Sequence, residues 1–159
     1  MNIYIEADVE AQASRVRQVM SIVEWKPGMT KTFLGKKDGT YNEAVLKTLV
    51  QVMGWLIQVK SIGPEEAVIV CSKNTWIPTW INTRLVMWRE NGYKRKDGQT
   101  IKNADLWQKL VEYAGVRPIE GKTGAHSYYR WMTQKMKSLR DREVPDQNGI
   151  QGAKTAGKQ

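Results

Sequence analysis

At the start of the chain, apolar residues alternate with residues that are polar or aromatic. This period of two predicts a β-strand. The apolar positions of this first segment are Ile3, Ile5, Ala7 and Val9. Residues 16–25 form a second apolar-rich run that stops at a Pro-Gly pair, and residues 29–35 form a third that stops at a Lys-Asp-Gly turn. The pattern therefore predicts three consecutive strands, arranged as an antiparallel meander.

The spacing of apolar residues changes to three and four near residue 42, which predicts an amphipathic helix. The stripe expected to face the core consists of Val45, Leu46, Leu49, Val52, Met53 and Leu56. After a Gly-Pro break, residues 67–71 form a short uninterrupted apolar run, which is typical of a strand buried in a parallel sheet. A helix and a fourth strand are therefore expected after the meander.

Three more helices and a fifth strand are expected further along the chain. Residues 75–90 predict a helix with Pro78 in its first turn, where a missing amide proton matters least. A second helix is expected from about residue 103 to residue 115, because it starts at a capping residue and stops at a glycine. Residues 116–119 then predict a strand, and residues 127–142 predict the last helix.

The expected fold is α/β, with a five-stranded mixed sheet flanked by helices in the order β-β-β-α-β-α-α-β-α. We expect this domain to span residues 1–143. Residues 144–159 lack apolar periodicity and are expected to form a flexible C-terminal tail.

Composition narrows the classes of function. The chain has 25 Lys and Arg against 16 Asp and Glu, a formal charge of +9 that favours a phosphate-rich partner. A single cysteine, Cys71, excludes an intramolecular disulfide, and a single histidine leaves little material for a structural zinc site. No apolar run approaches the ~20 residues of a membrane span. We therefore expect a cytoplasmic protein with a nucleic-acid partner and no membrane contact.

An ungapped motif follows the fourth predicted strand. Between Trp88 and Leu110 the chain matches W-x3-G-[aromatic]-K-x2-D-G-x2-[IV]-K-N-x-D-L-W-Q-[KR]-L. This motif, together with the order of elements in the whole chain, resembles type 1 ribonucleases H and implies an RNase H-like fold. In that family the basic loop within the motif is a handle that grips the DNA strand of an RNA/DNA hybrid. A hybrid has near-A-form geometry, so recognition uses phosphates and sugars rather than base edges.

We expect a set of nucleic-acid contacts on the loop and around it. These are Asn42, Lys73, Asn74, Trp88, Arg89, Lys94, Arg95, Lys96, Lys102, Asn103 and Trp107. Trp88 and Trp107 are expected to support the basic loop. Asn42 and Asn74 match polar positions that touch the sugars or phosphates of the hybrid in the family. Core packing is expected for four other tryptophans, Trp55, Trp76, Trp80 and Trp131.

The catalytic acids of the family are only partly matched. Ribonucleases H cleave the RNA strand with two Mg²⁺ ions, which are held by carboxylates of the first strand, the first helix, the fourth strand and the last helix. Here the first strand offers Glu6 and Asp8. The acid of the first helix aligns with Val45, and Glu43 lies two residues earlier, on another side of the helix.

The two remaining positions carry no acid. Lys73 aligns with the central ligand at the end of the fourth strand, and residues 128–139 of the last helix are free of Asp and Glu. Because an ammonium group repels a divalent ion, we expect Lys73 to pair with Glu6 or Asp8 instead. His126 lies near a flexible histidine that assists product release in the family, but without the metal ligands we expect a helix-entry or surface role.

These observations favour a catalytically inactive RNase H-like protein that binds RNA/DNA hybrid or double-stranded RNA through the basic loop, without a cofactor. One alternative is a scaffold of a phage or mobile element that interacts with a protein partner. A weaker alternative is an active Mg²⁺-dependent RNA/DNA-hybrid ribonuclease with relocated carboxylates, for which the candidates are Glu6, Asp8 and Glu43.

Overall fold

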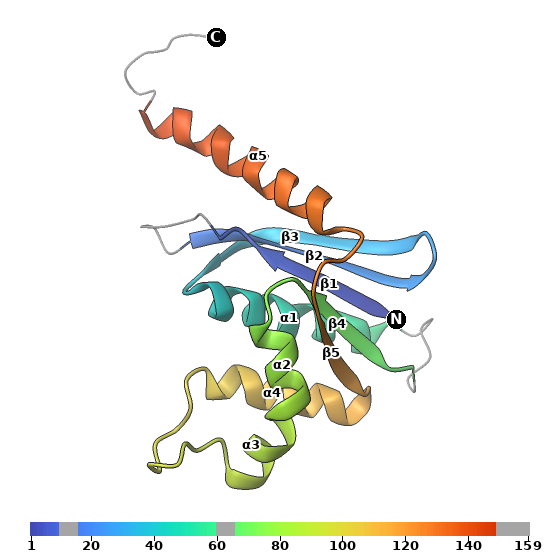
Figure 1. Ribbon diagram of the computed structural model, residues 1–159, viewed down its shortest axis with the longest axis vertical. Coiled ribbons are helices and arrows are strands. Elements are labelled where there is room, and N and C mark those ends of the chain that lie inside the picture. Colours follow the sequence, from blue (N-terminus) through green and yellow to red (C-terminus); the bar gives the residue numbers. More distant parts are fainter. Residues whose placement is uncertain (10–15, 60–65, 149–159) are drawn as a thin grey trace.

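The computed structural model describes residues 1–9, 16–59 and 66–148, with side chains described as far as residue 142. At its centre is a five-stranded sheet of order β3-β2-β1-β4-β5 (Figure 1). The strands are β1 (Asn2–Ala7), β2 (Val16–Lys26), β3 (Met29–Asp38), β4 (Val68–Ser72) and β5 (Ile119–Thr123). The pairs β1–β2 and β2–β3 are antiparallel, whereas β1–β4 and β4–β5 are parallel. The predicted meander and mixed sheet are confirmed.

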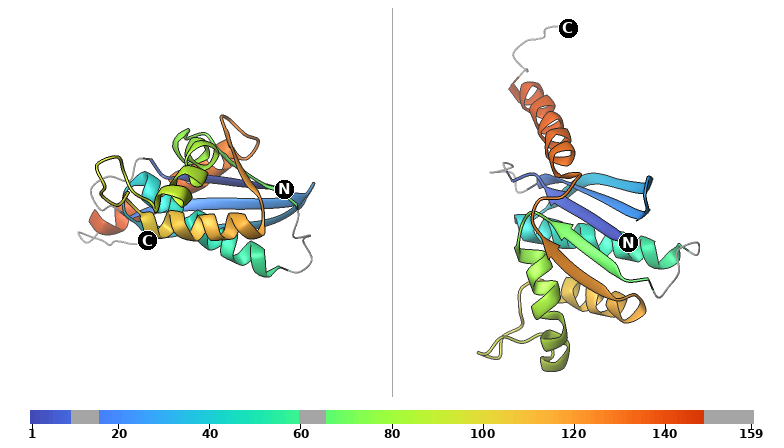
Figure 2. Two further views of the ribbon diagram at one scale, coloured as in Figure 1. Left: turned by 90° about the horizontal axis from the view of Figure 1, so that it is seen from below. Right: turned by 45° about the vertical axis from the view of Figure 1, so that its right-hand side comes forward.

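The helices are α1 (Tyr41–Gln58), α2 (Trp76–Thr83), α3 (Leu85–Asn91), α4 (Ala104–Val116) and α5 (Tyr129–Asn148). α1 packs against the sheet, and α4 lies beside α1 on the same side (Figure 2). α2 packs against β5, and α5 packs on β1 and β2 from the opposite face. Within the described ranges, no helix is long and apolar enough to cross a membrane.

α1 begins with a capping box. The hydroxyl of Thr40 accepts a hydrogen bond from Glu43 N, and the Glu43 carboxylate accepts one from Thr40 N, each at 3.2 Å. The apolar stripe predicted for this helix, from Val45 to Leu56, is buried in the main core. The carboxylate of Glu43 therefore caps the start of α1.

β1 supplies side chains to two cores. Ile3 and Ile5 belong to the main core beneath α1, whereas Tyr4 belongs to a smaller core that includes Met132 of α5. Because successive side chains of a strand point to opposite faces, Glu6 lies on the same face as Tyr4. The strand thereby places an acidic side chain beside the start of α5.

Three boundaries differ from the sequence-based expectations. The helix predicted for residues 75–90 is interrupted at Arg84, whose φ of −120° departs from helical geometry and separates α2 from α3. The fifth strand starts at Ile119, because the residues up to Val116 continue α4. The prediction that Val9 extends the first strand is wrong, since it lies beyond β1 and is 71% exposed.

The C-terminal helix runs past its predicted end. α5 continues to Asn148, whereas the sequence pattern placed its end at residue 142. The main-chain hydrogen bonds of a helix do not require apolar periodicity, so a helix can continue beyond the end of its apolar stripe. Most of the predicted flexible tail, residues 149–159, lies outside the described residues.

Candidate functional site

A groove opens between the start of α1, the helices α2 and α3, and the basic loop, which we define as residues 92–103. Its volume is about 930 Å³. The cations that line it are Arg84, Lys94, Arg95, Lys96 and Lys102. None of the described residues in this lining is acidic. This basic groove therefore has a positive field suited to phosphate groups, and Figure 1 shows its loop at the opposite end of the molecule from α5.

Backbone hydrogen bonds give the basic loop a hairpin-like shape. Ile101 N donates to Tyr93 O at 2.9 Å. Arg95 N donates to Gln99 O at 2.7 Å, and Gly98 supplies the positive φ of 85° that the turn requires. The loop is therefore shaped by its own backbone, and its lysines project from a defined scaffold.

The charge of Arg95 is partly compensated inside the loop. Its guanidinium forms an ion pair with Asp97 at 2.5 Å and donates a hydrogen bond to Gln99 Oε1 at 3.1 Å. The contact with Asp97 raises the pKa of Arg95, and the guanidinium lowers the pKa of Asp97 below its usual value. Three basic residues of the loop have no acidic partner among the described residues, namely Lys94, Lys96 and Lys102. These lysines therefore dominate the field of the loop.

Two of the expected contact residues are buried supports. Trp88 is 3% exposed and Trp107 is 1% exposed, and their ring centroids lie 4.9 Å apart. Both rings also contact Trp80. Both residues line the basic groove, so their contact with nucleic acid stays a prediction. Their predicted role beneath the basic loop agrees with the geometry.

Two tryptophans that were expected in the core are exposed. Trp76 is 42% exposed in the first turn of α2 and lines the basic groove. Trp131 is 51% exposed on α5. Helical spacing shows that a residue lies on a particular face but not whether another element covers that face, and the core prediction is wrong for both residues.

Only some of the other residues expected to contact nucleic acid line the groove. Asn42 and Asn103 line it, and Asn42 Oδ1 is buried without a hydrogen-bond partner among the described atoms. Arg89 is exposed on α3 but is absent from the lining. Lys73 and Asn74 line a separate cavity of about 380 Å³. Sequence reasoning missed Arg84, although its position one helical turn after Trp80 and one before Trp88 indicates the same face.

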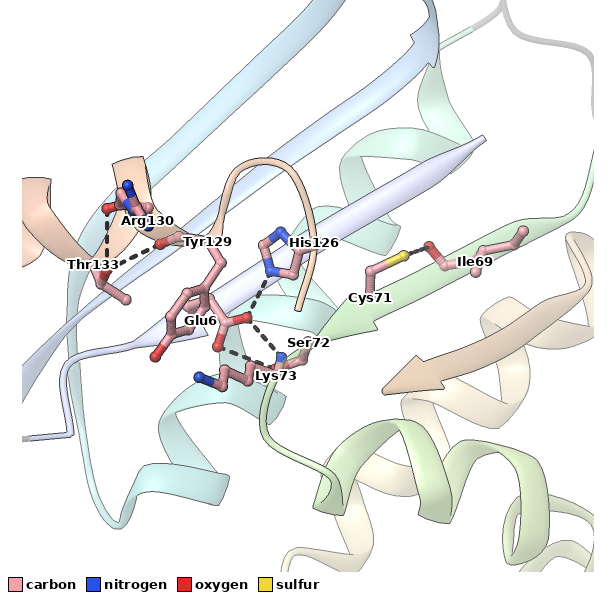
Figure 3. Close-up of polar contacts among 9 residues, drawn as sticks. All are labelled: Glu6, Ile69, Cys71, Ser72, Lys73, His126, Tyr129, Arg130 and Thr133. Atoms are coloured by element: carbon pink, nitrogen blue, oxygen red, sulfur yellow. Dashed lines mark hydrogen bonds and ion pairs between the residues drawn. The ribbon is translucent and has the colours of Figure 1, made fainter. Parts of the chain in front are cut away.

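The separate cavity adjoins a group that we call the Glu6 cluster, formed by Glu6, Ser72, Lys73 and His126 (Figure 3). Glu6 is 2% exposed. One carboxylate oxygen, Oε2, accepts a hydrogen bond from Lys73 N at 2.8 Å and lies 2.7 Å from His126 Nε2. The other oxygen, Oε1, accepts one from Ser72 Oγ at 3.3 Å. Both oxygens of Glu6 are therefore engaged by neighbouring protein groups.

The predicted ion pair between Lys73 and an acid is not formed in the described structure. The ammonium group of Lys73 instead lies 4.6 Å from the ring centroid of Tyr129, and Lys73 reaches Glu6 only through its backbone amide. Asp8, which is 6% exposed, accepts a hydrogen bond from Arg140 Nη1 of α5. Glu6 and Asp8 thus contact different elements, and neither forms the predicted ion pair with the Lys73 ammonium.

The expectation of a surface position for His126 is also wrong. Its side chain is only 6% exposed and contacts the rings of Tyr4 and Tyr129. The residue nevertheless lies at the entry to α5, where its carbonyl oxygen accepts a hydrogen bond from Tyr129 N at 3.1 Å. Figure 3 shows the imidazole directed at Glu6 from the segment that joins β5 to α5. The burial follows from the way this segment folds over the end of the sheet.

The residues present do not fit a pair of magnesium ions. Mg²⁺ requires several hard oxygen ligands in near-octahedral geometry. The oxygens of Glu6 already accept hydrogen bonds, and Asp8 faces Arg140. Glu43 caps α1 and does not line the cavity, so the three remnant candidates are not assembled. Among the described residues, no three His, Cys, Asp or Glu side chains are grouped as a metal site.

A half-buried tyrosine, Tyr41, also lines this cavity. Burial raises the pKa of Tyr41, and the negative charge of Glu6 raises it further. The Tyr41 hydroxyl therefore stays protonated at neutral pH, and Tyr41 lies in the same wall as the ammonium group of Lys73. The cavity therefore combines a neutral phenol and a cation with the carboxylates of Glu6 and Asp8.

Sequence comparison places the chain beside bacterial proteins named Ribonuclease H, although no family model matches it. The chain is 26% identical to the protein of Maricaulis maris strain MCS10 over 100 residues, which are 63% of this chain and 64% of that one. It is 30% identical to the protein of Pseudomonas putida strain F1 over 78 residues, which are 49% of either chain. The matches thus span less than two thirds of the length of these relatives.

Comparison with solved structures agrees with the sequence comparison. LC11-RNase H1, solved in complex with an RNA/DNA hybrid, superposes with a TM-score of 0.55 at 12% identity, over 87% of this chain and 91% of that one. At this identity the likeness shows the fold alone. The chain therefore has an RNase H-like fold and resembles proteins named Ribonuclease H in sequence.

Proposed function

We propose that this chain binds RNA/DNA hybrid or double-stranded RNA in the basic groove and does not cleave the bound strand. The observation that carries the proposal is the lining of the groove, in which five cations are present and no described residue is acidic. Such a surface suits closely spaced phosphates, because each phosphate contact releases a condensed counterion. The structural relative LC11-RNase H1 is described in complex with an RNA/DNA hybrid, which supports the choice of ligand.

The lack of cleavage is supported by the Glu6 cluster. Two-metal hydrolysis needs carboxylate oxygens that are free to hold Mg²⁺ and activate water. Here Glu6 accepts hydrogen bonds from Lys73 N and Ser72 Oγ, and the ammonium of Lys73 occupies the same cavity. At a separation of ~4 Å and an effective dielectric of about 20, an ammonium and a divalent ion repel each other by several kcal/mol. Strand binding without a metal is therefore the favoured function.

A titration experiment tests the binding. Labelled RNA/DNA hybrid, double-stranded RNA and double-stranded DNA are titrated with protein across a range of salt concentrations, with and without Mg²⁺. We expect hybrid and RNA duplex to bind more tightly than DNA, without dependence on Mg²⁺. If three to five phosphates are contacted, the slope of log K against log salt should be roughly −3 to −4.5.

A matched set of charge variants locates the surface. Replacing Lys94, Lys96 and Lys102 by Ala should flatten the salt slope by roughly 2.7, since each lost phosphate contact removes about 0.9. The control replaces three lysines of β2 and β3, Lys26, Lys36 and Lys37, which do not line the groove and give the same net charge. Weak binding that is unaffected by the first triple variant would favour the protein-interaction scaffold.

A cleavage assay tests the absence of hydrolysis. Hybrid with a labelled RNA strand is incubated with the protein in Mg²⁺ and in Mn²⁺, with a functional ribonuclease H as a positive control. We expect the RNA strand to remain intact. Robust hydrolysis that is lost in Glu6→Gln would establish the active alternative and overturn this part of the proposal.

A further inference from the structure

Trp76 presents an aromatic ring to the basic groove. The residue lies in the first turn of α2 and is 42% exposed. Its ring centroid is 3.8 Å from that of Trp80, with 31° between the ring planes, so the two indoles are stacked. The residues are one helical turn apart and therefore lie on the same side of the helix. One side of the Trp76 ring is covered by Trp80, and solvent reaches the remainder.

The stack is held on a buried aromatic base. Trp80 lies 5.2 Å from Trp88 and 5.9 Å from Trp107 between ring centroids, and both of these rings are in the core. The guanidinium carbon of Arg84 lies 5.0 Å from the Trp80 ring centroid. Packing on several sides therefore fixes Trp80, and Trp76 extends the aromatic cluster from the core to the floor of the groove.

The phosphates of a paired duplex do not account for this floor. Cations alone neutralise phosphates, and the bases of a duplex are stacked on one another, so their faces are not free to pack on an indole. An unpaired nucleotide offers both chemical groups at once. Its base can stack on an aromatic side chain while its phosphate binds a cation, and such stacking accepts any base because every base has a π-face.

We propose that Trp76, supported by Trp80, stacks an unpaired nucleobase in the basic groove while the surrounding cations bind the adjoining phosphates. The complementary charge of the lining, with Arg84 and Lys96 among its cations, favours a nucleic acid over an apolar protein segment as the occupant. The inference rests on the proposed function and specifies its ligand class. That ligand is a duplex carrying a single-stranded overhang or gap.

The test compares ligands that differ only in the unpaired segment. Fluorescence anisotropy is measured with a blunt RNA/DNA hybrid, the same hybrid with a short thymidine overhang, and the same hybrid with an abasic overhang. We expect the wild-type protein to prefer the thymidine overhang over the abasic one by about tenfold, the contribution of one base–aromatic stack. The abasic overhang controls for the added phosphates.

A pair of tryptophan variants assigns the effect to one residue. Trp76→Ala should lose about tenfold in affinity for the thymidine overhang and a clearly smaller factor for the blunt hybrid. Trp76→Phe, which keeps an aromatic face, should recover most of the loss. The control is Trp131→Ala on α5, because Trp131 is also exposed but does not line the groove. Thermal unfolding of each variant checks that the helix packing survives.

The outcomes separate this inference from the function on which it rests. If the wild type does not distinguish the thymidine overhang from the abasic one, or if Trp76→Ala weakens blunt and overhang ligands equally, the stacking site is refuted. The groove remains the binding surface in either case, provided that the triple lysine variant loses affinity. If the triple variant binds every ligand as the wild type does, the proposed function itself fails.

Discussion

The Glu6 side chain should stabilise the fold, whereas an acid of a metal site destabilises the fold when the metal is absent. In Glu6→Ala, the donors Lys73 N and Ser72 Oγ lose their acceptor, and His126 Nε2 loses its contact with the Glu6 carboxylate. A buried polar group left unsatisfied costs about 1–3 kcal/mol. Because Lys73 N is only partly buried and the Ser72 contact is long, we expect a total loss of about 3–5 kcal/mol rather than the full sum.

The sign of the change in the free energy of unfolding distinguishes a structural role of Glu6 from a metal-binding role. Acids that share a metal site repel one another when the metal is absent, so removing one of them leaves the free energy of unfolding unchanged or increases it. In the Glu6 cluster the carboxylate has donors and, among the described residues, no acidic neighbour within hydrogen-bond distance, so its removal should decrease the free energy of unfolding.

Urea denaturation followed by circular dichroism measures the difference. For a slope near 2 kcal/mol/M, the urea midpoint of Glu6→Ala should fall by roughly 2 M. Glu6→Gln keeps one acceptor oxygen and should lie between wild type and Glu6→Ala. The control is Glu120→Ala, an exposed position on another strand of the same sheet, where we expect a change within about 0.5 kcal/mol. A Glu6→Ala variant as stable as the wild type would refute the reasoning.

Three further predictions concern single side chains. Asp97→Asn should release Arg95 and tighten hybrid binding, and it should steepen the salt slope measured by anisotropy by about 0.9. Because the pKa of Asp97 is lowered, the wild-type ion pair persists at neutral pH and is lost only as the pH falls through that pKa. Gly121→Ala should destabilise the protein by roughly 1–3 kcal/mol in thermal unfolding, because its Cβ would lie 2.1 Å from Pro78 O, whereas Gly115→Ala meets nothing within 4 Å and should be neutral or slightly stabilising. Thr40→Ala should cost about 1 kcal/mol in denaturant unfolding through loss of the α1 capping box, and an unchanged midpoint would contradict that role.

The elements that were predicted well depend on local signals. The stripe from Val45 to Leu56 and the capping residues of α1 lie within a few turns of one another, so the sequence alone indicates both the helix and its buried face. The strand meander follows from short apolar runs separated by turn residues, and its register needs no distant partner. The break at Arg84 had no such signal, because neither proline nor glycine marks it.

The parts of the site that were predicted poorly depend on distant residues. The alignment identified Lys73 correctly as the residue at the end of β4, but the position of its ammonium is decided by Tyr129, which α5 brings to the sheet. The burial of His126 likewise depends on the path of the segment before α5. Trp76 lies one helical turn from Trp80, yet it is 42% exposed, because exposure depends on which distant elements cover that face.

The Glu6 cluster also has a consequence for folding kinetics. The carboxylate joins residues that are 66 positions apart for Ser72 and 120 positions apart for His126. Contacts that close such long loops carry a large entropic cost and tend to form after the transition state. We therefore expect Glu6→Ala to accelerate unfolding and leave the refolding rate nearly unchanged in stopped-flow denaturant experiments. On this expectation, the buried carboxylate of Glu6 governs how long the native state lasts.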